Sequence, residues 1–456
     1  MEIARRAGSV WHARPHRLPA PPEHALAEAF PSGTPSVTSR LSRLSRRKLL
    51  ALGGSSALGA AAVSGGAWAW LGRGRGRGDT TAPKPPAAAS KKPAWDLLWQ
   101  VATSSVDPQV PPVPLVLDGL LVAGEFGVQG LNPVTGAVRW SDPEVYFLRR
   151  TATDGKRIYA ADHTLEESDP LSVSTVDPAT GEINAPFSEL KDLRAILDGT
   201  QVLCATADAV YLAGGRGPHT ESGFGKAQSW FLLGIDIRSG DKLWEVPLPA
   251  RPDESTRLHF LSAESVGEYL VLVQQSADGE PRLVVHNALT GEALWNRPLD
   301  GEQPAFSRAH LAVDGRHVYP SAGELVALGL ADGKEAWRFE GETPKARFSP
   351  PATKDGVVYA VEENRGIVAL DAADGSLRWA EKSREVTTED LDAPPVIGVA
   401  SVYAHSKESS ALVAVDIRTG AVTRRVKAAK ARYFAHASAR RLIAVGDEHT
   451  AAYPLD

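Results

Sequence analysis

The sequence predicts an all-β fold, an eight-bladed β-propeller built of four-stranded antiparallel blades. A ten-residue phrase recurs seven times along the chain, and the glycines of successive copies lie 45, 59, 51, 42, 42 and 45 residues apart. Upstream of each copy, short apolar strands alternate with Gly- and Asp-containing turns, as in residues 355–370. A repeat of about forty residues made of such strands is typical of a propeller, in which each repeat is one blade.

Each copy of the phrase contains an apolar strand, Asp or Asn, two variable residues, a Thr-Gly-like pair, three further residues and Trp. The clearest copies are residues 131–140, 235–244 and 370–379. The Asp or Asn side chain can accept a hydrogen bond from the backbone two residues on, and glycine supplies the positive φ that closes the turn. The phrase therefore predicts a turn between two antiparallel strands at Gly136, Gly181, Gly240, Gly291, Gly333, Gly375 and Gly420.

An indole four residues after the glycine occupies the same place in most copies, because side chains alternate along a strand. We expect each indole to wedge between neighbouring sheets and to bury up to ~200 Å2. The position is held by Trp140, Trp244, Trp295, Trp337 and Trp379. Ala185 and Arg424 replace the Trp, so blades two and seven should pack more weakly there; in the fifth copy Gly329 replaces the Asp.

The two ends of the repeat region predict how the ring closes. Residues 441–456 supply the early strands of a blade and stop at the Asp of the phrase, while the strand-like segment 95–100, which contains Trp99, has no unit before it. Pairing this first strand with the last blade would close the ring and remove free sheet edges. Seven turns and one split blade give eight blades over residues 95–456, with seven blades as the alternative.

The repeats resemble those of the pyrroloquinoline-quinone-like, or quinoprotein-type, β-propeller superfamily, whose docking phrase is Ala-x-Asp-x-x-Thr-Gly-Lys-x-x-Trp. The resemblance covers essentially all of residues 95–456 and implies the propeller fold. Related quinone-dependent dehydrogenases carry an adjacent-cysteine disulfide, calcium-binding acidic residues and a stacking Trp in the central funnel. Cys204 is the single cysteine, so this chain cannot form that disulfide. The other two features match no positions here, and no cofactor-binding residue is assigned.

The first 94 residues differ from the rest in charge. They hold 15 Lys and Arg against 4 Asp and Glu (+11), which leaves 35 against 51 (−16) for the remainder. Residues 1–44 predict a disordered, basic and Pro-rich lead, and residues 72–94 predict a disordered spacer. Between them, residues 45–71 place Arg46 and Arg47 before the uncharged span 49–71. This order resembles a twin-arginine export signal and also fits a membrane anchor.

Cleavage and retention of this segment stay open. Residues 67–69 match a small-x-small cleavage pattern, whereas the span 49–71 is long enough to cross a bilayer. Either outcome predicts an extracytoplasmic protein, secreted or anchored to the cell membrane by residues 49–71. The order of lead, span, spacer and propeller also resembles the C-terminal half of actinobacterial membrane Ser/Thr kinases, whose propellers are extracellular sensors.

The sequence contains no catalytic constellation and no metal-ligand spacing, so no catalytic or metal-binding residue is assigned. Cys204 lies in an apolar run and is expected to be a buried strand residue. The glycine-rich stretch 214–226 fails the phosphate-loop pattern and favours an inter-strand insertion. Two acidic clusters are expected to be solvated loops: Asp162, His163, Glu166, Glu167 and Asp169, and Glu385, Glu389, Asp390 and Asp392.

An acidic propeller argues against nucleic acid or an anionic membrane as its main partner. The sequence therefore favours a non-catalytic, exported propeller that binds an unknown ligand or protein partner, as a sensor or scaffold, through its loop face or central funnel. A quinoprotein-like oxidoreductase with an atypical cofactor site is the alternative, with pyrroloquinoline quinone as its cofactor; no cofactor is otherwise predicted. A third interpretation is an assembly scaffold resembling the envelope-biogenesis propellers of outer membranes.

Overall fold

The computed structural model describes residues 97–103, 113–124, 128–142, 151–162, 170–194, 200–217, 229–249, 260–275, 280–299, 310–321, 323–384, 386, 391–406, 409–446 and 448–456. Contacts divide the chain into residues 1–88 and 89–456, and every described residue lies in the second unit. Within these ranges the chain forms strands and turns and no helix, which confirms the all-β prediction.

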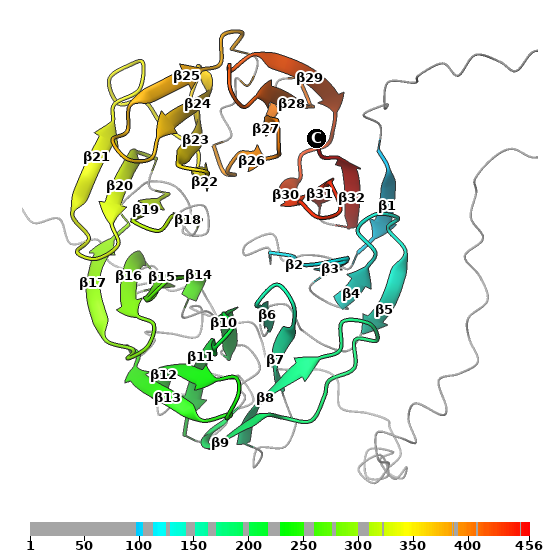
Figure 1. The fold of residues 1–456 in the computed structure, drawn as a ribbon, viewed down its shortest axis with the longest axis vertical. Helices are drawn as coiled ribbons and strands as arrows, with labels where there is room; N and C mark the ends of the chain where they lie inside the picture. The colour runs from blue at the N-terminus through cyan, green and yellow to red at the C-terminus, as the bar shows by residue number, and fades with distance from the viewer. Residues whose placement is uncertain are drawn as a thin grey trace, which may run out of the picture. The chain divides into compact units, whose positions relative to one another are not determined.

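Six sheets contain four antiparallel strands each, arranged round a ring (Figure 1). Four of them follow chain order from the strand nearest the ring axis to the outermost strand: β2 (Leu115–Leu117), β3 (Leu120–Ala123), β4 (Val128–Leu131) and β5 (Val138–Asp142); β14 (Phe260–Val266), β15 (Tyr269–Gln275), β16 (Pro281–Asn287) and β17 (Ala293–Pro298); β18 (Leu311–Val313), β19 (His317–Pro320), β20 (Leu325–Gly329) and β21 (Glu335–Phe339); β22 (Ala352–Lys354), β23 (Val357–Glu362), β24 (Gly366–Asp371) and β25 (Leu377–Ala380).

The next sheet, β26 (Val396–Ile397), β27 (Ser401–Ser406), β28 (Ala411–Asp416) and β29 (Val422–Lys427), has the same order. The sixth joins segments far apart in the sequence: β30 (Arg432–His436), β31 (Arg441–Val445) and β32 (His449–Pro454) are completed by β1 (Trp99–Ala102). β1 runs antiparallel to β32, with Trp99 opposite Ala452. The predicted closure of the ring is therefore confirmed.

The seventh sheet has eight strands. It contains β6 (Thr151–Thr153), β7 (Ile158–Asp162), β8 (Pro170–Val176), β9 (Ser188–Arg194), β10 (Gln201–Ala205), β11 (Ala209–Arg216), β12 (Ser229–Asp236) and β13 (Lys242–Pro247). One residue pair, Arg194 with Gly215, joins the β6–β9 half to the β10–β13 half. Because the described strands form seven sheets, one of them double, the count of eight blades stays a prediction.

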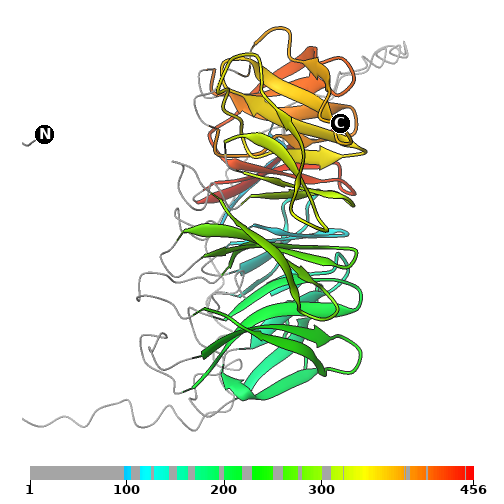
Figure 2. The ribbon, with the colours of Figure 1, turned by 90° about the vertical axis from the view of Figure 1, so that its left-hand side faces the viewer.

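We call each run of four strands a set, and the contact between adjacent sets a joint. Seen from the side, the twisted sets lie one behind another around the ring (Figure 2). The buried apolar side chains form eight clusters, and each cluster draws its residues from two adjacent sets. The core of the described body is therefore divided among the joints, because each sheet buries one face against the set before it and the other against the set after it.

Candidate functional site

Six joints are fastened by a tryptophan. In each, the indole of the outermost strand of one set lies against the glycine of the next set's phrase turn, and its Nε1 donates a hydrogen bond of 2.7–3.0 Å to a backbone carbonyl in that turn. The pairs are Trp99 with Gly136, Trp140 with Gly181, Trp244 with Gly291, Trp295 with Gly333, Trp337 with Gly375, and Trp379 with Gly420.

The glycine in these pairs is required for two reasons. At Gly375 the backbone has a φ of 71°, a region that favours glycine, and a Cβ there would lie 2.6 Å from the ring of Trp337. The turn is further fixed by its first residue: Asp371 Oδ1 accepts a hydrogen bond of 2.9 Å from the backbone N–H of Ala373. The phrase thus encodes both the turn and the surface that receives the neighbouring indole.

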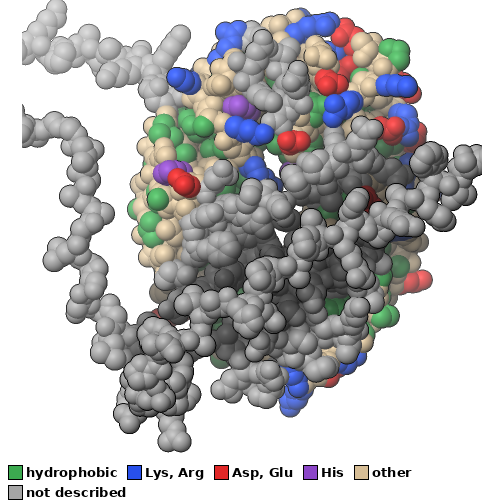
Figure 3. All heavy atoms as spheres, turned by 180° about the vertical axis from the view of Figure 1, so that it is seen from behind, with side chains coloured by type: hydrophobic (Ala, Val, Ile, Leu, Met, Phe, Trp, Pro, Cys, Tyr) green, Lys and Arg blue, Asp and Glu red, His purple; other side chains and the backbone are tan. Residues whose placement is uncertain are grey.

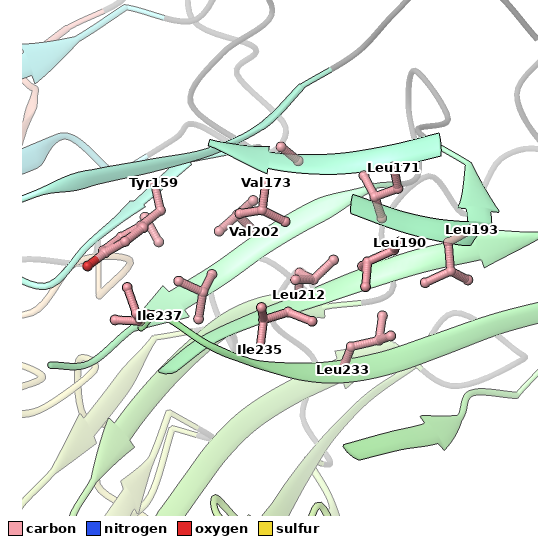
Figure 4. Packing of buried hydrophobic residues seen from close by; sticks show 13 residues of the cluster. Tyr159, Leu171, Val173, Leu190, Leu193, Val202, Leu212, Leu233, Ile235 and Ile237 are labelled. Carbon is pink, nitrogen blue, oxygen red and sulfur yellow. The ribbon is translucent and has the colours of Figure 1, made fainter. Parts of the chain in front are cut away.

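Two joints lack the tryptophan, and each is built differently. At the joint between β9 and β10, the backbone of Phe187 and Ser188 lies against the next set's phrase turn at Gly240. Ser188 Oγ donates a hydrogen bond of 2.7 Å to the carbonyl of Gly240. An apolar cluster with thirteen buried members fills this joint, including Tyr159 and Leu212 (Figure 4). Ala185, which stands where other sets have Trp, is exposed.

The joint between β29 and β30 is the second. Here the outer strands β32 and β1 of the receiving set are not consecutive in sequence, so no phrase turn joins them. Arg424 at the Trp position is exposed, and Tyr403 and Tyr453 belong to the apolar cluster of this joint. The Asp456 carboxylate accepts hydrogen bonds of 3.1 Å from the backbone N–H groups of Val399 and Ala400.

The innermost strands carry titratable groups, of which the sequence singled out Cys204 but not Glu264. Glu264 on β14 is solvent-accessible, yet the surrounding protein limits its hydration and raises its pKa to about 7. Cys204 on the adjacent innermost strand β10 packs at the edge of an apolar cluster, and burial, followed by the nearby charge of Glu264, raises the pKa of its thiol. A thiol held in its neutral form is a poor nucleophile.

A second cluster of polar residues contains one residue from each of three different sets. His310, directly before β18, makes a hydrogen bond with the backbone of Asp392, which precedes β26. Burial, together with the charge of Arg432 on β30, lowers the pKa of His310 to about 4. Burial also lowers the pKa of Arg432 to about 10, so the guanidinium is charged and the imidazole neutral at physiological pH. Neither residue was singled out from the sequence, because the contacts cross more than eighty positions.

Several residues weighed in the sequence lie outside the described ranges. These are Arg46 and Arg47 of the export segment, residues 163–169 of the first acidic cluster, Glu385, Glu389 and Asp390 of the second, and residues 218–226 of the glycine-rich stretch. Of the second cluster, Asp392 is described, and it is exposed. Among the described residues, no helix is long and apolar enough to cross a membrane.

The described residues do not fit a calcium-held quinone. No group of three or more His, Cys, Asp or Glu within the described ranges is placed to hold a metal ion. Six of the described indoles occupy the docking positions, and the seventh, Trp230, is buried on β12. None of these seven lies on an innermost strand, where it could stack on a ring bound at the axis.

The family model and the curated relatives that match this chain carry the same description. The family model described as outer membrane protein assembly factor BamB matches residues 232–456. Two curated proteins carry the same description: that of Yersinia pestis is 27% identical over 215 residues, 44% of this chain and 52% of the relative. The protein of Alkalilimnicola ehrlichii is 31% identical over 144 residues, which are 29% of this chain and 34% of the relative. The chain thus spans about half the length, or less, of the curated relatives it matches.

Solved structures match most of this chain at low sequence identity. The computationally designed Ika8 protein has a TM-score of 0.50 at 12% identity, over 78% of this chain and 99% of that chain. BamB from Moraxella catarrhalis has a TM-score of 0.45 at 16% identity, over 78% and 98%. A quinohemoprotein alcohol dehydrogenase from Comamonas testosteroni has 0.44 at 13% identity, over 79% and 76%. The likeness to the designed protein bears on the fold alone.

The closed ring and its docking joints define a β-propeller assembled from repeated, mutually fastened units. Its repeats are similar to those of the quinoprotein-like β-propeller superfamily, as the sequence indicated. Its second half carries repeats of the type described for the outer membrane assembly factor. The two relatives do not support the actinobacterial type suggested by the order of the segments, which stays a prediction.

Proposed function

We propose that this protein is a non-catalytic, extracytoplasmic propeller that acts as a scaffold for a protein partner. The observation that carries the proposal is the match of residues 232–456 to the family model of an outer membrane protein assembly factor, together with the two relatives of the same description. A closed body fastened at its joints supports the same role, since it presents loops and edge strands on a rigid frame.

The test of this role is a defined complex. The full chain, tagged at its C-terminus and produced in its native host, would be cross-linked and purified from the envelope fraction. A scaffold predicts one partner in fixed stoichiometry, which re-forms a complex with the purified full chain in size-exclusion chromatography. Purified protein that stays monomeric in the presence of every cross-linked candidate would end the proposal.

Extracytoplasmic location is the second part of the proposal and depends on residues 45–71. Replacing both Arg46 and Arg47 by Lys should leave the protein in the cytoplasmic fraction, because twin-arginine export requires the paired arginines. Protease added to intact spheroplasts reports location: the parent should be degraded and the variant protected. Degradation of both proteins would exclude the twin-arginine route. Protection of both proteins would exclude export.

The oxidoreductase alternative is weaker, because the described residues do not fit a calcium-held quinone. It makes a separate prediction. Full-length protein incubated with pyrroloquinoline quinone and Ca²⁺ would then reduce an artificial dye in the presence of an alcohol, and protein from the native host would show a cofactor absorbance band. Either result would replace the scaffold role by an enzymatic one.

A further inference from the structure

The set that closes the ring is held to the next set by a small apolar cluster. We call β30, β31, β32 and β1 the closing set, and its contact with the set β2–β5 the closing joint. The cluster of this joint has seven buried residues, of which one, Trp99, is aromatic. The joint between β21 and β22 has eleven, including Tyr319, Trp337 and Phe348. Because stabilisation grows with the apolar area buried, the closing joint gains less from packing.

The closing joint also contains buried polar atoms without a partner. Side chains alternate along a strand, so Arg441 shares a face with Ile443 on β31, and Gln129 shares a face with Leu131 on β4. Ile443 and Leu131 both belong to the cluster of the closing joint. Arg441 Nε and Gln129 Oε1 are buried and have no hydrogen-bond partner among the described residues. Such atoms disfavour the closed joint, because water can hydrogen-bond to them once the joint opens.

The polar side chains that do reach across the closing joint make long hydrogen bonds. His436 Nε2 lies 3.4 Å from the carbonyl oxygen of Leu120, and Arg441 Nη2 lies 3.5 Å from that of Val134. The indole of Trp99 donates at 3.0 Å across the same joint. Because a hydrogen bond weakens as it lengthens beyond about 3 Å, Trp99 is the main fastener of this joint and the other two contacts add little.

The rim of the closing joint is apolar and exposed. Four exposed aliphatic side chains surround the contact between Trp99 and its glycine, two before β1 and two near the phrase turn: Leu97, Leu98, Val134 and Val138. Charged side chains gather at the upper end of the view in Figure 3, whereas its left-hand side, which is the side of β1 and β5 in Figure 1, carries mostly hydrophobic and uncharged side chains. The four aliphatic side chains stay largely in water when the joint is closed, so their area adds little to closure.

We propose that the closing joint is a seam, at which the closing set and the set β2–β5 separate and rejoin while the other joints stay packed. In a body made of repeated units, each contact between neighbours contributes its own stability, so the ring opens first where that contribution is smallest. Opening loses a small apolar cluster and lets water reach Arg441 and Gln129. The seam is a conformational property of the ring, and it goes beyond the scaffold role without depending on it.

Thiol labelling of the native full chain tests the seam. Ala123→Cys places a thiol in the cluster of the closing joint, and Ala360→Cys is the matched control in the cluster of the joint between β21 and β22. Each alanine is the fifth residue after the Asp of its set's first turn, and they are 1% and 0% exposed. The parent, which carries Cys204 alone, gives the background rate. A seam predicts labelling about tenfold faster, or more, for Ala123→Cys than for Ala360→Cys.

Low concentrations of urea separate opening of the seam from unfolding of the whole ring. Opening one joint exposes little surface, so labelling of Ala123→Cys should hardly change below the unfolding transition, whereas that of Ala360→Cys should rise steeply with urea. Equal rates at the two sites, or the same dependence on urea, would overturn the seam. Ala444→Cys reports on the joint between β29 and β30, and faster labelling there than for Ala123→Cys would overturn the assignment to the closing joint.

A stabilising variant tests the physical cause of opening. Adding Gln129→Leu to Ala123→Cys removes an unpaired buried oxygen at similar volume, so labelling should slow about threefold or more, while labelling of Ala360→Cys with the same addition should not change. Unchanged or faster labelling of the first pair would overturn the role given to the polar atoms. Ala452→Cys, in the same cluster on the opposite side of the joint, replaces Ala123→Cys if circular dichroism shows that the latter does not fold.

Discussion

The joint between β21 and β22 and the joint between β9 and β10 perform the same task with different residues. In the first, Trp337 packs on Gly375 and donates to the carbonyl of Ala372 at 3.0 Å. In the second, the sheet continues from one set into the next, and a hydroxyl and an aliphatic cluster replace the indole. The comparison shows that a tryptophan is one way to fasten a joint and that direct strand contact is another.

The largest expected effect comes from removing the indole at a fastened joint. Trp337→Ala should lower the free energy of unfolding by about 3–5 kcal/mol, because it leaves a cavity between two sets and an unpaired carbonyl at Ala372. Urea denaturation of the full chain measures the change. Trp337→Phe is the control, which retains much of the apolar area and should cost less. A loss below about 1 kcal/mol for the alanine variant would show that the indole does not fasten the joint.

The receiving glycine should be nearly as sensitive. Gly375→Ala is expected to cost about 2–3 kcal/mol, because a Cβ would force the Trp337 ring away and alanine disfavours positive φ. Gly356 is the matched control, since it has a φ of 74° and a Cβ added there would meet no atom within 4 Å. Its alanine variant should cost about 1 kcal/mol. Equal losses at the two sites in urea denaturation would remove the role assigned to the indole contact.

The joint without an indole predicts a smaller effect. Ser188→Ala removes the 2.7 Å hydrogen bond to the Gly240 carbonyl and should cost about 1–2 kcal/mol. The apolar cluster around Leu212 remains intact, so the urea midpoint should fall less than for Trp337→Ala. A loss as large as that of the tryptophan variant would show that this joint depends on one polar contact.

The smallest effect concerns pH. The folded pKa of Glu264, about 7, lies above its ordinary value of 4.5, so the folded state holds a proton that the unfolded state releases. This contribution to stability is complete below pH 4.5 and is lost as the pH rises to 7. Glu264→Gln should therefore match the parent at pH 4.5 and exceed it by about 1 kcal/mol at pH 8, a value reduced for solvent screening. Parallel urea titrations at the two pH values would reveal no difference if Glu264 ionises normally.

Much of the fold could be predicted from the sequence because its signals are local and repeated. The segments 355–361 and 366–370 were predicted as strands and correspond to β23 and β24. The phrase also placed each turn, since the Asp or Asn and the glycine act within a few residues of each other. The predicted number of blades is not confirmed in the same way, because the pair of Arg194 with Gly215 merges two sets into one sheet.

The polar groups near the axis could not be predicted in the same way. His310, Asp392 and Arg432 come together only because three sets place their first strands around one axis. Strand β29 carries Arg424, Arg425 and Lys427, but its position at an outer edge, with these residues on both faces, depends on pairing with β28. Arg424 appeared there merely as a missing Trp.

By itself, the sequence determined the repeating unit, its turns, the docking residues and the closure of the ring by the first strand. These features follow from backbone geometry and side-chain alternation, which act over short distances and recur in each copy. The tertiary structure alone decided how the two joints without tryptophan are filled, which charges meet near the axis and which edge is basic on both faces. Those outcomes depend on contacts between distant segments, and such contacts exist only after the sets have packed against one another.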